Sequence, residues 1–250
     1  MKILHAALTV LACAAISETA IAQITVGTFD TGNCYPFMCN DSGTSVGQSI
    51  EYQQVYSSAA FSMPVAITSE TFYWQGAQIF GGSDTLLGGS YLFSLSTTAA
   101  PVNGLSSTLA SNLGPDNAPV LLFSVPAGGQ SFGTSFTFHN AVPFFYNPGL
   151  GNLLMDVNVS GASAPGGNIF FDTNGFNGGA DNGNTIVGRV YCPFGDCSMH
   201  SPVAESGYGL VTDFSTGTAV PEPSFVYVLG GALALLGVAQ RVRRNRRADG

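Results

Sequence analysis

Basic residues are almost missing from the middle of this chain of 250 residues. The sequence holds seven Lys and Arg, and only Arg189 lies between Gln23 and Ala219, against twelve acidic residues. This stretch therefore carries a net charge of −11 with histidine neutral. Such a charge repels nucleic acid, which proteins bind through clustered Lys and Arg. It also leaves almost no cations for salt bridges, so burial, backbone hydrogen bonds and crosslinks must stabilise the fold.

Recognisable catalytic and cofactor motifs are also missing. The sequence shows no phosphate-binding loop, no dinucleotide-binding motif and no catalytic acid pair, so we expect no cofactor and no enzymatic activity. Residues 129–133 have the G-x-S-x-G spacing of a serine nucleophile, but a strand-like run follows where that mechanism needs a helix. We interpret this stretch as a glycine-rich turn. His139 and His200 have no identifiable partners.

Long amphipathic helical patterns are absent, whereas short runs of alternating polarity recur between Gly, Pro and Asn turns. The high aromatic content argues against a disordered chain. The runs predict strands at 50–56, 66–74, 90–98, 119–125, 132–139, 151–160, 168–172, 185–191 and 208–214. We therefore predict that residues 23–219 form one all-β domain, a β-sandwich or jelly roll of about eight to ten strands.

The N-terminus has the three parts of a secretory signal peptide. Lys2 supplies the positive start, residues 3–16 are apolar, and Ala20 and Ala22 provide an A-x-A cleavage site. We predict that residues 1–22 direct the chain to the Sec translocon and are removed between Ala22 and Gln23. A retained N-terminal anchor is the alternative.

Four cysteines remain after this cut, in two C-x4-C loops that both contain Pro-Phe. They are Cys34 with Cys39, and Cys192 with Cys197. An even count in an exported protein favours disulfides. We expect pairing within each loop, and each six-residue ring is worth about 2 kcal/mol in the chain-entropy model. The alternative is a structural zinc site built from all four thiolates, with His200 as a further ligand.

Two further patterns are weaker. The loop 172–184 is rich in oxygen ligands, so Asp172, Asn174 and Asp181 are candidate calcium ligands, but the loop fails the EF-hand template and a plain hairpin loop is the default. We therefore predict no metal site. Trp74 and the aromatic run 144–146 offer a sugar-stacking platform, although aromatics in a β protein more often belong to the core.

The C-terminus carries a compact tripartite pattern. Pro221, Glu222 and Pro223 lie in the stretch 220–224, an uncharged apolar stretch follows at 225–240, and a basic tail occupies 241–247. The basic residues are Arg241, Arg243, Arg244, Arg246 and Arg247. A helix over 225–239 spans about 22 Å, short of a full hydrocarbon core, and the arginine stems can extend it. The Arg cluster favours a cytoplasmic end, which leaves the domain outside. A permanent anchor is the alternative to a tail that is cut.

These three features in this order resemble the PEP-CTERM sorting signal, a region also labelled "ice-binding protein C-terminal domain". The resemblance implies processing near Pro221–Pro223 by exosortase, a membrane enzyme of Gram-negative bacteria that make exopolysaccharide. It implies a precursor tethered to the inner membrane and a product at the cell surface or in the extracellular matrix. The ice-binding label carries no activity to residues 23–219, which show no Thr-x-Thr ladder.

The domain itself resembles uncharacterised secreted PEP-CTERM proteins of β-sandwich type. The similar stretches are 34–39, 51–56, 146–157, 171–172, 188–191 and 209–214. The expected function is that of an exported, non-enzymatic envelope or matrix protein associated with exopolysaccharide. The alternative is a secreted carbohydrate-binding module or carbohydrate-active hydrolase, which an exposed pair of carboxylates would favour.

Overall fold

The computed structural model describes residues 21–39, 48–75, 83–164, 168–175, 186–192 and 201–218. The chain divides into two units, Met1–Thr218 and Ala219–Gly250, and all described residues belong to the first. The predicted sorting motif Pro221–Pro223, the apolar stretch 225–240 and the basic tail 241–247 lie outside the described residues, as does most of the predicted signal peptide. No helix in the described part of the chain is long and apolar enough to cross a membrane.

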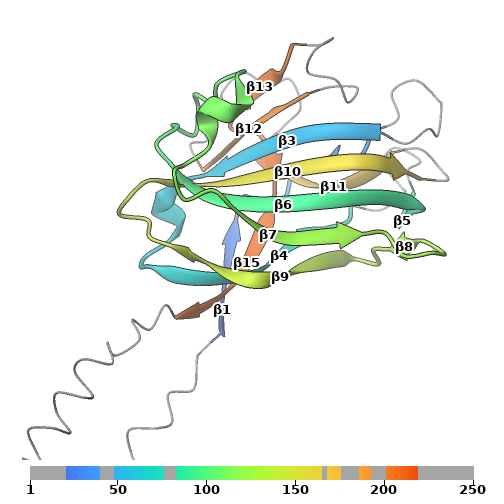
Figure 1. Cartoon of the computed structure of the whole chain (residues 1–250), viewed down its shortest axis with the longest axis horizontal. Helices are drawn as coiled ribbons and strands as arrows, with labels where there is room; N and C mark the ends of the chain where they lie inside the picture. Colours follow the sequence, from blue (N-terminus) through green and yellow to red (C-terminus); the bar gives the residue numbers. More distant parts are fainter. Residues whose placement is uncertain are drawn as a thin grey trace, which may run out of the picture. The chain divides into compact units, whose positions relative to one another are not determined.

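Two antiparallel sheets face each other as the main layers (Figure 1). The larger has the order β13-β12-β3-β10-β6-β7, and its strands are β13 (Val203–Ser206), β12 (Val187–Tyr191), β3 (Gln48–Tyr56), β10 (Asn152–Ser163), β6 (Gly88–Thr98) and β7 (Ala118–Ser124). The other has the order β1-β15-β4-β9, with β1 (Ile21–Val26), β15 (Thr212–Thr218), β4 (Val65–Tyr73) and β9 (Ser135–Tyr146). This arrangement confirms the predicted all-β, sandwich-like fold.

Two smaller sheets complete the domain. One has the order β14-β11-β2, with β14 (Gly209–Leu210), β11 (Ile169–Asn174) and β2 (Thr31–Met38). The other pairs β5 (Thr85–Leu86) with β8 (Gln130–Ser131). The described residues contain two short 3-10 helices, η1 (Ser58–Ala60) and η2 (Leu109–Asn112), and no α-helix.

The hydrophobic core lies between the two main sheets and follows the period-two pattern of the sequence. Met155 and Val157 on β10 are fully buried, as are Tyr91, Phe93 and Leu95 on β6. Successive side chains of a strand point to opposite faces, so these residues share the inner face. The predicted inward face of 151–160 is therefore confirmed.

The outer face of the larger sheet is also partly covered. Segment 99–117, which includes η2, packs Val102, Leu105 and Leu109 against Leu154 and Val190 on that face. This second, smaller core explains why the strands of the larger sheet bury side chains on both faces. The packing of segment 99–117 on the sheet could not be predicted from the sequence, because these residues show no regular periodicity.

Candidate functional site

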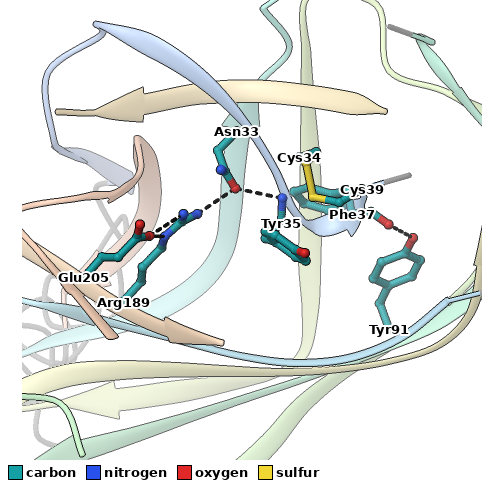
Figure 2. The surroundings of a disulfide bond; sticks show 8 residues. All are labelled: Asn33, Cys34, Tyr35, Phe37, Cys39, Tyr91, Arg189 and Glu205. Atoms are coloured by element: carbon teal, nitrogen blue, oxygen red, sulfur yellow. Dashed lines mark hydrogen bonds and ion pairs between the residues drawn. A yellow bond between two sulfur atoms is a disulfide. The ribbon is translucent and has the colours of Figure 1, made fainter. Parts of the chain in front are cut away.

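The disulfide loop sits where the small sheet meets the main core (Figure 2). Cys34 and Cys39 form a disulfide with an S–S length of 1.99 Å, which confirms the predicted local pair. A zinc site that uses all four thiolates is excluded, because these two are oxidised. Cys192 is disulfide-bonded as well. Its predicted partner Cys197 lies outside the described residues, so the second predicted pair stays a prediction.

The loop carries Phe37 into the centre of the core. Its ring lies 4.2 Å from that of Phe171 and 5.7 Å from that of Phe138, centroid to centroid. The hydroxyl of Tyr91 on β6 donates to the Phe37 carbonyl at 2.8 Å. The disulfide therefore closes a short loop around an aromatic anchor that joins β2 to both main sheets.

Arg189 on β12 is fully buried beside this loop (Figure 2). Its Nε donates to Glu205 Oε2 at 2.6 Å, and its Nη2 lies 2.5 Å from the same oxygen. Its Nη1 donates to the Asn33 side-chain oxygen at 2.6 Å, and that oxygen also accepts the Tyr35 amide. Because Asn33 and Tyr35 belong to β2, the guanidinium ties β2 to the larger sheet.

Tyrosine rings enclose the guanidinium on its faces. The Arg189 Cζ lies 4.2 Å from the ring centroid of Tyr208 and 4.7 Å from that of Tyr191. Tyr52 donates to Gln54 Oε1 at 2.5 Å, and burial raises the pKa of Tyr52 far above its usual range, so it remains a donor. The guanidinium is closed to solvent, so we interpret this cluster as a structural one that stabilises the fold.

Glu70 is a second buried ionisable group, and it lies in the apolar core. It faces Phe214 on β15 and Phe138 on β9, and directly opposed residues of an antiparallel pair share one face. Asn140 Nδ2 donates to Glu70 Oε1 at 3.0 Å, while Glu70 Oε2 has no hydrogen-bond partner. Burial raises the pKa of this carboxyl to about 7.

Asp156 and Glu51 form a diagonal carboxyl pair on the outer face of the larger sheet, since Asp156 opposes Gln53 and Glu51 opposes Asn158. Asp156 is buried, and it accepts from Gln53 at 3.1 Å and from Asn158 at 3.0 Å. Burial, with a smaller contribution from the neighbouring Glu51, raises the pKa of Asp156 to about 6. A hollow of about 330 Å³ on this sheet is lined by Asn158, the partner of Asp156, and by neither carboxyl of the pair.

The other predicted site residues do not come together as a site. Asn174 is buried, and both ends of its side-chain amide are hydrogen-bonded to backbone. Its oxygen accepts from the Thr28 amide at 2.9 Å, and its nitrogen donates to the Gly207 carbonyl at 3.0 Å. Asp172 is half-buried, burial raises its pKa, and Asp181 lies outside the described residues. No group of three metal-ligating side chains occurs in the part of the chain that the structure describes.

The aromatic candidates belong mainly to the core. Trp74 is half-buried and donates from Nε1 to the Ser83 carbonyl at 3.3 Å. Phe144 and Tyr146 are buried, and only Phe145 of that run is exposed. The stretch 129–133 contains β8, so the predicted turn-like region holds a short strand and no helix.

The two ends of the domain lie side by side in the four-stranded sheet. Ile21 on β1 opposes Gly217 on β15, and Ala22 opposes Thr216. The predicted signal cut between Ala22 and Gln23 therefore falls inside β1. The Gln23 side-chain amide donates to the Asp213 carboxylate of β15, so the residue after the cut is held by its neighbouring strand.

Comparisons with known proteins are sparse. No protein-family model matches the chain, and no curated protein is significantly similar to it. Two solved structures, of the Gx and Gt strains of infectious bursal disease virus, have TM-scores of 0.23 and 0.22 at 12% and 10% identity. They cover 90% and 92% of this chain, and the chain spans about half of each of those chains, 51%. Likenesses this weak carry no argument about function.

Proposed function

We propose that this chain is an exported, non-enzymatic envelope protein that carries a PEP-CTERM sorting signal. The signal peptide directs it to the Sec translocon, and residues 225–240 hold the precursor in the inner membrane. Exosortase then acts near Pro221–Pro223, and the acidic domain associates with exopolysaccharide at the surface of a Gram-negative cell.

The observation that carries this proposal is the pairing of Ile21 with Gly217. The removed N-terminal segment ends at Ala22, one residue after Ile21, and the sorting motif begins at Pro221, four residues after Gly217. A cut after Ala22 leaves Gln23–Val26 paired with β15, and a cut near Pro221 leaves all of β15. Trimming at both sites therefore spares the core. The Cys34–Cys39 disulfide fits an oxidising compartment as well.

The test is the intact mass of the protein extracted from the surface of the source cells. The expected mass lacks residues 1–22 and the C-terminal tail, and it lacks the thiol hydrogens of the bonded cysteines. A variant with alanine at positions 221–223 should retain the tail and stay in the membrane fraction. Recovery of the full-length chain from the cytosol with free thiols contradicts the proposal, as does normal trimming of the alanine variant.

A carbohydrate-binding or hydrolytic role is the second candidate, and the Asp156–Glu51 pair favours it. Asp156, with a pKa raised to about 6, accepts a hydrogen bond from Asn158, which lines the hollow, and carboxyls with raised pKa values are common at sites of acid–base chemistry. Its test is binding and hydrolysis of polysaccharides by the intact protein and by Asn158→Ala. Polysaccharide binding or hydrolysis that the original chain shows and Asn158→Ala lacks supports the role. Absence of both activities from both proteins contradicts it.

A further inference from the structure

Four exposed apolar side chains lie on the last part of β9 or in the segments that flank β4 and β9 at the same end of the four-stranded sheet. Met63, Val142, Phe145 and Leu150 are 54%, 63%, 69% and 76% exposed. We call these four residues the apolar end. Met63 precedes β4 and Leu150 follows β9. Because β4 and β9 are antiparallel, with Ala66 opposite Phe145, the start of β4 and the finish of β9 coincide.

The same end of the sheet carries both ends of the domain. One row of opposed residues runs across four strands, from Ile21 to Gly217, Ala66 and Phe145. Neighbouring strands lie about 4.8 Å apart, so Phe145 is separated from Gly217 by about 10 Å of sheet. Figure 1 shows the start of β1 and the end of β15 projecting past β9.

Charged residues avoid this end. The segments 21–29, 57–69, 140–155 and 214–218 contain none, although residues 23–219 carry twelve acids. An acidic surface is repelled by anionic lipid headgroups, whereas an uncharged one with exposed apolar side chains is not. Exposed apolar groups on an otherwise polar surface mark contact sites for proteins or membranes.

We propose that the apolar end rests on the lipid bilayer while the C-terminal tail holds the protein there. This inference rests on the proposed membrane tether. Thr218 ends β15 only seven residues before Phe225, where the uncharged stretch of the tail begins. A tether this short gives the apolar end a high effective concentration at the membrane, so weak insertion of a few side chains is enough. Release of the tail removes that advantage and frees the domain.

The experiment uses the full chain in phosphatidylcholine vesicles with brominated acyl chains, which quench tryptophan fluorescence. Trp74 is replaced by Phe, and Phe145→Trp is compared with Leu122→Trp. Leu122 is the matched control because it is 64% exposed but lies on β7, at the edge of the other sheet. Flotation of the vesicles measures the tether separately.

We expect several-fold stronger quenching in the Phe145→Trp variant than in the Leu122→Trp variant. Equal quenching, or none, in chains that float with the vesicles overturns the docking proposal and leaves the tether standing. Failure of the chain to float overturns the tether itself. A tryptophan at position 145 that is protected from lipid quenching only at a high ratio of protein to lipid would show that the apolar end binds a second copy of the chain. That result overturns lipid docking.

A second measurement keeps Trp74 in place. Hydrogen exchange of segment 140–150 is compared between vesicles and detergent for the original chain, Phe145→Asp and Leu122→Asp. Protection of this segment in vesicles should be lost only in Phe145→Asp. Protection that is unchanged by Phe145→Asp overturns the proposal.

Discussion

Arg189 and Glu205 stand directly opposite each other on β12 and β13, and the Arg189 Nε donates to Glu205 Oε2 at 2.6 Å. The single cation of residues 23–219 is therefore used inside the fold. It is the only residue of the described part of the chain that forms an ion pair with a carboxylate. The cation bridges two sheets and leaves the acidic surface uncompensated.

Replacing Arg189 by Met should destabilise the domain by about 3–5 kcal/mol, because Glu205, whose side chain is only 17% exposed, and the buried Asn33 both lose their charged donor. Glu205→Gln should cost less, since Glu205 is partly exposed and the guanidinium keeps Asn33 and its tyrosine contacts. Urea unfolding followed by the fluorescence of Trp74 measures both. A loss below about 1 kcal/mol in Arg189→Met contradicts this role.

Glu70 should make the domain more stable in acid than in weak base. Its pKa is raised from 4.5 to about 7 in the folded chain, mainly by burial. The folded state therefore holds the proton more tightly, and this contribution is fully present below pH 4.5 and is lost as the pH rises through about 7. The contribution of Glu70 to the free energy of unfolding is on the order of 3 kcal/mol.

The control for Glu70 is Glu70→Gln, which keeps the shape and cannot ionise. At pH 8 this variant should unfold at higher urea concentration than the original chain, and at pH 4 the two should be similar. Asp156, with a pKa raised to about 6, adds a smaller slope of the same sign that Glu70→Gln leaves intact. If the free energy of unfolding depends on pH identically in the original chain and in Glu70→Gln, Glu70 is not neutral in the folded core.

The period-two pattern was sufficient to predict the principal strands, because burial on one face sets it. Tyr91, Phe93 and Leu95 alternate with Leu92, Ser94 and Ser96, and all three point inward. The prediction failed where burial does not alternate. β2 contains Pro36 and is almost entirely buried. β1 starts at Ile21, so its first two residues overlap the predicted signal peptide 1–22.

The buried polar residues could not be predicted, because their partners are distant in sequence. Arg189 meets Asn33 across 156 residues, and Glu70 meets Asn140 across 70. β9 was predicted to end at His139 and extends to Tyr146 through Pro143. Proline is tolerated there because β9 is an edge strand, a position that only the sheet order reveals.

Loss of the Cys34–Cys39 disulfide should lower the free energy of unfolding by about 2 kcal/mol, the loop-closure value for a ring of six residues. The double change Cys34→Ser and Cys39→Ser tests it by urea unfolding. Phe37→Leu is the comparison, since it leaves the bond but removes the aromatic anchor packed on Phe171 and Phe138. Unchanged stability of the double variant means that core packing alone fixes this loop.

Two glycines test whether segment 99–117 is seated on the larger sheet. A Cβ at Gly188 on β12 would lie 2.0 Å from the Val102 carbonyl oxygen, whereas a Cβ at Gly217 on β15 would meet no atom within 4 Å. Gly188→Ala must therefore push the covering segment away from the sheet, and Gly217→Ala need not move anything.

We expect Gly188→Ala to cost about 1–3 kcal/mol, as overpacking does, and to speed hydrogen exchange in residues 99–117. Gly217→Ala should be neutral or slightly stabilising, because alanine restricts the unfolded chain more than glycine does. Both glycines lie in strands, so β propensity alone predicts the same effect at each site. Equal stabilities of the two variants would show that the covering segment yields freely and does not pin the outer face.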